Sequence, residues 1–371
     1  MKWFHAVPFL VALAATTVVH AAETSDVMRQ IEQMVSSGER APNSLGESIR
    51  DGIEQNPQEV SKALVQRLDD QNLTESQQVV YVWALGLARD PSAVGPIKSM
   101  HGKSKSAKVK GSCLRALAMI GGPEAETFLL STLDATTGMY ERFEILNLLG
   151  QMQSQAALPK TEEILKLGDK LHWQNIFVFG KMGDKAVPFL LGKIGDKDRN
   201  IRANSIDLLG QWLIPPEAAK PLQDQFWVEK DVELRLALLN SLERVMPDPA
   251  QMKAFFQQVL SKGGEQEVTK FAQETVDSIN EKSLKSISDM ARKKQPSPAS
   301  FQKEYTQLFK SAGKKGSYDT LGAASTIGDE PRLKALRERI LQRDSDEAFG
   351  DYQKVNGIIA MNRIINAMGS K

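Results

Sequence analysis

Cysteine and histidine are scarce in this sequence. Cys113 is the only cysteine, so no disulfide can form within one chain, and only His101 and His172 remain beyond the first 21 residues. Zinc sites and histidine-based catalysis need several ligands close together, or a base with an orienting partner. No Gly-x-Ser-x-Gly elbow, phosphate-binding glycine loop or acidic calcium loop occurs either. We therefore predict a protein that is not an enzyme and that carries no cofactor and no metal.

The sequence also lacks a charge imbalance and, after residue 21, any long apolar run. It has 47 basic and 46 acidic side chains, and Lys2 is the one charged residue among the first 21. A neutral chain gives no general electrostatic reason to bind nucleic acid. Because a membrane helix needs about 20 apolar residues, we expect no membrane span after residue 21.

Residues 1–21 have the layout of a secretory signal peptide. Lys2 precedes an apolar run over 7–19, and Ala21 supplies a small residue for cleavage. The run is too short for a good membrane span, although an uncleaved anchor is the alternative. We predict a periplasmic or secreted protein of a Gram-negative bacterium.

A short apolar segment that ends in a small residue recurs along the chain. Its last residue stands at steps of 32, 32, 30 and 30 residues, at Gly86, Ala118, Gly150, Gly180 and Gly210. Within each copy the apolar residues are three and four apart, which is typical of one helix face, and the constant step indicates two-helix repeats. We expect the small residue to let the second helix of the pair cross closely.

The start of the first regular repeat and the lone cysteine give two local predictions. Thr74 and Gln77 have the spacing of a capping box, so a helix is expected to begin after Thr74. Cys113 lies in an apolar helical stretch, which favours a buried and unreactive thiol.

The repeats resemble HEAT repeats, most closely the short variety of phycobilisome-lyase-type proteins. The resemblance covers about residues 75–262 and rests on Ala-Leu-Gly helix ends, Gly-Pro or Asp-Pro breaks and hydrophobic–basic pairs, which are Val109-Lys110, Ile201-Arg202 and Leu234-Arg235. In such repeats an acidic residue about two turns upstream belongs with the basic one. The resemblance thus implies a charged ladder between stacked repeats, to which Asp196 with Arg202 and Glu229 with Arg235 belong. The ladder is expected to break at 171–173, and the alternative is simply solvated charges.

The resemblance implies an all-α fold, an α-solenoid or superhelix of antiparallel helix pairs. We expect about 8–10 pairs with atypical ends, because terminal repeats face water on one side. The predicted organisation is a signal peptide over 1–21, divergent N-terminal helices that form a cap over 22–74, HEAT-like repeats over 75–293, a hinge over 294–300, and C-terminal helical repeats with a cap over 301–371.

Charges and aromatic residues suggest two further features. Residues 22–74 are acidic, whereas 282–315 and a lysine-rich stretch over 98–110 are basic. Such a charge gradient would orient a partner or promote head-to-tail association, and solvated loops are the alternative. Most aromatic residues are expected in the core, but Trp227 and Phe256 fall near predicted helix ends, where one of them would serve as an exposed binding anchor.

The expected function is that of an exported scaffold that binds a protein or peptide on its concave face. The second helix of each pair would line that face. We expect a monomer, or a chain that associates only weakly with itself. An enzyme such as a bilin lyase, which the repeat subtype suggests, and an exported inhibitor or immunity protein remain alternatives, although export argues against chemistry that belongs with cytosolic phycobiliproteins. The candidate partner-binding residues are Lys98, Glu126, Lys160, Glu163, Lys193, Gln223, Lys253 and Gln257.

Overall fold

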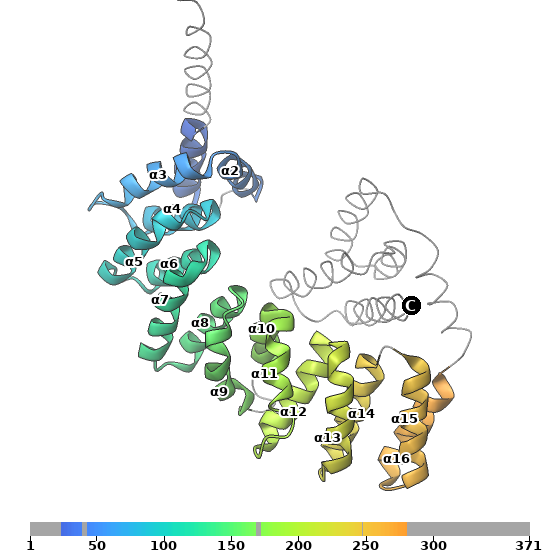
Figure 1. Cartoon of the computed structure of the whole chain (residues 1–371). Coiled ribbons are helices and arrows are strands. Elements are labelled where there is room, and N and C mark those ends of the chain that lie inside the picture. The colour runs from blue at the N-terminus through green and yellow to red at the C-terminus, as the bar shows by residue number, and fades with distance from the viewer. Residues whose placement is uncertain (1–23, 39–42, 168–171, 247, 280–371) are drawn as a thin grey trace, which may run out of the picture. The chain divides into compact units, whose positions relative to one another are not determined.

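The computed structural model describes residues 24–38, 43–167, 172–246 and 248–279 (Figure 1). Of these residues 84% are helical, and no strand occurs among them, which confirms the predicted all-α fold. No helix in these ranges is long and apolar enough to cross a membrane. The predicted signal peptide, the hinge over 294–300 and the C-terminal repeats over 301–371 lie outside the described residues.

The chain divides into two compact units, unit 1 and unit 2, and the boundary in the sequence lies between Met152 and Gln153. In unit 1 a helix over 24–37 comes first. It is followed by α2 (Asn43–Gln55), α3 (Pro57–Leu68), α4 (Glu75–Ala88), the short η2 (Pro91–Ala93), α5 (Val94–Lys103), α6 (Ala107–Ile120), α7 (Gly122–Ala135) and α8 (Met139–Gln151).

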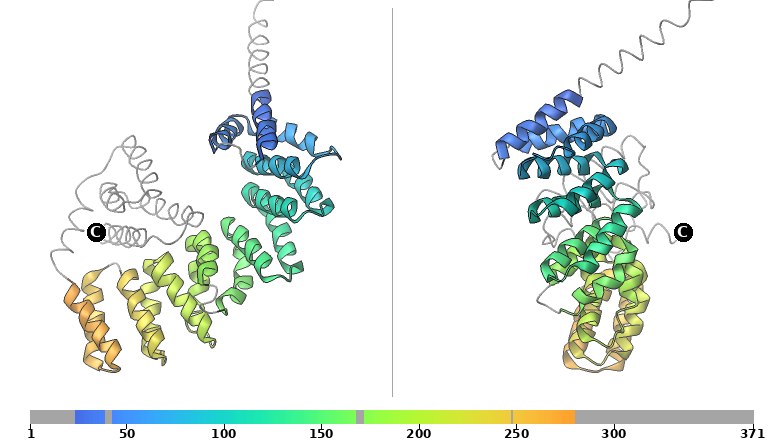
Figure 2. Two further views of the ribbon diagram at one scale, coloured as in Figure 1. Left: turned by 180° about the vertical axis from the view of Figure 1, so that it is seen from behind. Right: turned by 90° about the vertical axis from the view of Figure 1, so that its left-hand side faces the viewer.

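Helix pairs stack on one another in unit 1. The first helices α2, α4, α6 and α8 contact each other in that order, and the second helices α3, α5 and α7 do the same. Each second helix also packs against the first helix of the next pair. Figure 2 shows these helices as successive layers. The repeat that the sequence predicts therefore corresponds to one helix pair.

Unit 2 continues the alternation with shorter and less regular second helices at its start. Its elements are η3 (Gln155–Thr161), α9 (Glu162–Leu165), α10 (His172–Met182), η5 (Gly183–Ala186), α11 (Val187–Leu191), α12 (Arg199–Asp207), the π-helical η6 (Leu208–Leu213), η7 (Pro216–Ala218), α13 (Ala219–Val228), α14 (Val232–Val245), α15 (Pro249–Lys262) and α16 (Gln266–Ser278). The first helices again contact their successors, since α10 packs on η6, α12 and η6 pack on α14, and α14 packs on α16.

At two of the recurring glycines, the helix that packs closely is not the one that the sequence predicts. A Cβ atom on Gly86 would lie 3.0 Å from the Cα atom of Ala116 in α6, and one on Gly210 would lie 2.6 Å from the Cα atom of Ser241 in α14. Both neighbours belong to the first helix of the next pair, so the expected close crossing by the second helix of the same pair is wrong for these two glycines. The missing side chain instead lets consecutive repeats approach backbone to backbone.

Side chains at the helix ends explain where the repeats begin. The capping box at Thr74 is confirmed, because its hydroxyl accepts from the Gln77 amide at 3.2 Å and the Gln77 side chain accepts from the Thr74 amide at 2.9 Å. In unit 2 an aspartate precedes α12, α14 and α15 and accepts hydrogen bonds from the first free amides of that helix, and these caps are Asp198, Asp231 and Asp248. Each cap satisfies amides that have no partner within the helix.

The N-terminal helices are joined to the first regular repeat by a partly buried hydrogen-bond cluster. Glu32, in the helix over 24–37, accepts from the Tyr81 hydroxyl of α4 at 2.5 Å and from the Arg67 guanidinium of α3 at 2.8 Å. Burial, together with the Glu32 carboxylate, raises the pKa of Tyr81 above its usual value. The acidic N-terminal segment is therefore packed onto the repeats of unit 1 through one shared carboxylate.

Candidate functional site

The predicted partner-binding residues lie on the second half of each helix pair. Seven of them are half-exposed and Gln257 is exposed. Lys193 is the exception to the expected placement, because it lies in the turn after α11 and not in the helix. The other positions are Lys98 in α5, Glu126 in α7, Lys160 in η3, Glu163 in α9, Gln223 in α13, and Lys253 and Gln257 in α15.

Lys98 connects two second helices of unit 1. Its ammonium lies 2.8 Å from the Glu124 carboxylate at the start of α7, and 5.7 Å from the centre of the Phe128 ring. The His101 and Phe128 rings pack in a T-shaped arrangement with their centroids 5.3 Å apart. Burial, with help from the positive charge of Lys110, lowers the pKa of His101. Lys98 is therefore already engaged in the contact between α5 and α7.

Lys193 has the corresponding role in unit 2. Its ammonium lies 2.6 Å from Glu162 in α9, 3.6 Å from Asp196, and 5.6 Å from the centre of the Phe189 ring. The hydrogen bond to Glu162 raises the pKa of Lys193, and hydrogen bonds from Lys193 and Lys166 lower the pKa of Glu162. Gln223 contacts the next pair as well, because its amide lies 3.5 Å from the Met246 sulfur. Several predicted binding residues thus hold consecutive repeats together.

Of the two candidates for a single exposed aromatic anchor, only Trp227 reaches the surface. Phe256 is fully buried, so an anchor at that position is wrong: its ring lies in the core between the rings of Phe255 and Phe271. Trp227 is half-exposed at the end of α13, where its ring packs against Phe255 and the Lys262 ammonium lies 4.0 Å from its centre. The neighbouring Val228 is 66% exposed. This end of α13 is an apolar patch beside a cation.

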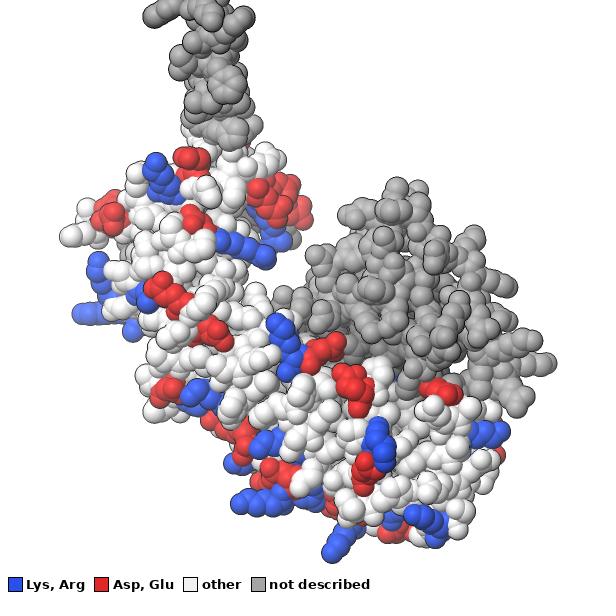
Figure 3. Space-filling model, in the orientation of Figure 1, with Lys and Arg blue, Asp and Glu red and all other residues white. Residues whose placement is uncertain are grey.

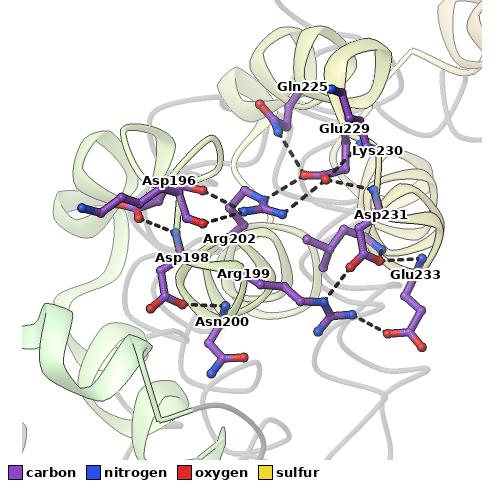
Figure 4. Close-up of polar contacts among 12 residues, drawn as sticks. Asp196, Asp198, Arg199, Asn200, Arg202, Gln225, Glu229, Lys230, Asp231 and Glu233 are labelled. Carbon is purple, nitrogen blue, oxygen red and sulfur yellow. Dashed lines mark hydrogen bonds and ion pairs between the residues drawn. The ribbon is translucent and has the colours of Figure 1, made fainter.

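The most extensive polar network joins α12 to the turn before α14 (Figure 4). Arg202 donates to Glu229 at 2.9 and 3.4 Å, and also to the backbone oxygen of Asp196 at 2.9 Å. Glu229 further accepts from the amides of Lys230 at 3.0 Å and Asp231 at 3.1 Å. The side chains of Glu229 and Arg202 are only 5% and 17% exposed. An inter-repeat ladder exists here, but each arginine pairs with the acid of the following repeat.

The ladder continues at the next repeat junction, and a second, more exposed set of ion pairs joins the same two repeats as Arg202 and Glu229. Arg235 forms an ion pair with Glu265, and the more exposed Arg199 pairs with Asp231 at 2.6 Å and with Glu233. Burial alone would raise the pKa of Glu229, but hydrogen bonds from the Asp231 amide and Arg202 hold it below its ordinary value. The expected ladder between stacked repeats is therefore present at Arg202 and Arg235, but each arginine pairs with an acid of the next repeat and not with the acid six residues upstream. The predicted break over 171–173 falls on side chains outside the described residues.

No protein-family model and no curated protein matches this chain. The HEAT-repeat likeness thus remains a prediction from the residues, and the structure adds the all-α helix pairs. Across the described ranges no group of three or more His, Cys, Asp or Glu side chains is placed to hold a metal ion. The described side chains of this region form polar, charged and aromatic contacts between consecutive repeats.

Cys113 is expected to resist thiol reagents in the folded protein. The side chain is fully buried, and burial raises the pKa of its thiol to about 12. At pH 8 only roughly one thiol in ten thousand is then ionised, and the thiolate is the reactive form. Reaction with a chromogenic disulfide reagent should be negligible for the native protein and complete within minutes in denaturant. Rapid labelling of the native chain would contradict this burial.

Proposed function

We propose that this protein is an exported, non-enzymatic scaffold that holds a protein or peptide partner on the face formed by its second helices. Unit 2 provides the observation that carries the proposal. Glu163, Lys193, Gln223 and Lys253 recur every 30 residues, and all four are half-exposed on the second half of successive helix pairs. A regular row of polar side chains on stacked repeats matches an extended polypeptide better than a compact small molecule.

The contacts of this row support a role in positioning. Lys193 and Gln223 already bridge neighbouring repeats, so the row is preorganised before a partner arrives. Preorganised side chains lose less conformational entropy on binding. The half-exposed Trp227 beside Lys262 would supply the aromatic anchor at one end of such a surface.

The proposal is tested by crosslinking in the periplasmic and extracellular fractions of the native host, followed by mass spectrometry with matched surface variants. Glu126→Lys on α7 and Gln257→Lys on α15 alter second helices. Glu144→Lys on α8 and Gln266→Lys on α16 make the same changes at exposed sites of first helices. We expect the second-helix variants to reduce capture of one protein partner severalfold and the first-helix variants to leave it unchanged.

Three outcomes would overturn the proposal. The first is absence of the chain from the exported fractions, and the second is equal partner capture by all four variants. The third is a small molecule or chromophore that remains bound through purification with no protein partner, which would favour an enzyme of the bilin-lyase type.

A further inference from the structure

Four exposed lysines surround the turn between α5 and α6 in unit 1. We call Lys103, Lys105, Lys108 and Lys110 the lysine cluster. None of the four side chains has a hydrogen bond or an ion pair within the part of the chain that the structure describes. Glu75 at the start of α4 accepts a hydrogen bond at 2.7 Å from Ser106, which lies between these lysines in the sequence. The cluster is therefore an unpaired positive patch.

Two lysines of the cluster lie at the start of α6, where a positive charge without an acidic partner is unfavourable. Lys108 and Lys110 lie in the first turn of α6, where no acidic residue is present. The N-terminus of a helix carries a partial positive charge, so cations there weaken the helix and a nearby anion would stabilise it. Two lysines therefore stand where they weaken the helix. Such locally unfavourable residues are expected where a surface binds another molecule.

The same unit also carries an unpaired negative surface. Glu47, Asp51 and Glu54 follow one another on α2 at spacings of four and three, which places them on one side of the helix, and all three are exposed. We call them the acidic stripe. Arg50 is the one basic residue of α2, and no ion pair joins it to the stripe among the described residues. Glu54 lies in the last turn, where the helix end is partially negative, and no basic residue compensates it.

We propose that the acidic stripe of one molecule docks on the lysine cluster of a second copy, so that the chains associate head to tail. Figure 3 shows basic side chains gathered at the edge of unit 1 over α5 and acidic side chains gathered over α2. Because the two surfaces are separate, their pairing forms between molecules. Each surface lacks a partner within the described part of its own chain, and the contact corrects an unfavourable charge at one helix end on each side.

The second copy is preferred to other anionic partners because the acidic stripe is observed on this chain. A heterologous contact leaves one free cluster and one free stripe at the ends of every assembly, so further copies can add. The contact is made of exposed charges, and it should therefore be weak and sensitive to salt. This inference concerns the contact of the chain with itself and does not depend on the proposed function.

The test is sedimentation equilibrium of the full chain and of charge-reversal variants. Low salt, about 20 mM, should favour association, and about 500 mM should weaken it at least about tenfold because the Debye length shortens. The two reversal variants are Lys105→Glu/Lys108→Glu in the cluster and Glu47→Lys/Asp51→Lys in the stripe. Each alone should be monomeric. The first variant leaves two lysines and two glutamates in the cluster, so the cluster has no net charge to attract the stripe, and the second variant gives the stripe a net positive charge that the cluster repels.

Mixing the two reversal variants should restore association, because the intact stripe of the cluster variant can dock on the intact cluster of the stripe variant. Lys62→Glu/Lys185→Glu changes the net charge by the same amount at exposed lysines outside the cluster and should associate like the wild type. A wild-type chain that stays monomeric at low salt, or a mixture that fails to associate, would overturn the proposal. So would binding to vesicles of anionic lipid that depends on the cluster while self-association does not.

Discussion

Replacement of Gly210 by alanine should destabilise unit 2 by about 3 kcal/mol, because the core around it has no room for a methyl group. The added Cβ atom would lie 2.0 Å from the Ser241 hydroxyl oxygen, 2.1 Å from its Cβ atom and 2.6 Å from its Cα atom. A flexible side chain could move away, but the Cα atom belongs to the α14 backbone. α14 would therefore have to shift away from η6, and this would loosen the contact between two consecutive repeats.

The measurement is urea unfolding followed by circular dichroism, with two other glycines as references. At Gly86 the nearest atom is the Ala116 Cα atom at 3.0 Å, so Gly86→Ala should cost less than Gly210→Ala. At Gly95, in α5, no atom lies within 4 Å, and Gly95→Ala should stabilise its helix by up to about 1 kcal/mol. Equal effects at the three positions would show that helix propensity, and not the contact between repeats, sets the outcome.

The repeat pattern and the recurring glycines show how far the sequence could predict the fold. A step of 30 to 32 residues with helical spacing was enough to predict helix pairs, because each repeat must bury the same face. The capping box at Thr74 and the burial of Cys113 were also predictable, since both depend on neighbours in the sequence. Periodicity shows that one face of a helix is buried, but it does not say which helix covers that face. The glycines were therefore assigned to the wrong neighbour.

The ladder and the acidic stripe were misjudged or missed for a related reason. Arg202 stands six residues after Asp196 in the sequence, yet its ion pair is formed with Glu229, 27 residues later. The fold places the start of one repeat beside the start of the next. A pattern within one repeat cannot predict which residues of two repeats become neighbours in this way. The stripe on α2 was counted only as part of an acidic segment. The spacing of Glu47, Asp51 and Glu54 was the signal that could have identified it.

The second large effect is expected at the buried pair of Arg202 and Glu229. Arg202→Met should destabilise unit 2 by about 3 kcal/mol, because it leaves the Glu229 carboxylate buried without its cation. The double variant Arg202→Met/Glu229→Met should recover most of this loss, since it removes both charges and keeps apolar volume. The single variant Glu229→Met completes the comparison. If the destabilisation of the double variant equals the sum of the two single variants, the two side chains do not act as a pair.

Arg199 provides a matched control on the same helix. It also pairs with acids of the next repeat, but its side chain is 47% exposed (Figure 4). Exposed ion pairs contribute little, so Arg199→Met should cost less than about 1 kcal/mol. Comparison of the same substitution at residues 199 and 202 separates the effect of burial from that of the charge itself.

Acidification should reveal which partner carries the effect. The pKa of Glu229 is held below its ordinary value in the folded protein, so the pair contributes its full stability above the pKa of an unfolded glutamate, about 4.3. That contribution is lost as the pH falls below this value and through the folded pKa. Without Arg202 the buried Glu229 has a higher pKa than in the wild type, so the variant binds this proton at a higher pH. The stability difference between wild type and Arg202→Met should therefore be largest near pH 7 and shrink as the pH falls through these two folded-state pKa values. A difference that is unchanged in acid would mean that lost packing of the arginine side chain, and not its charge, is responsible.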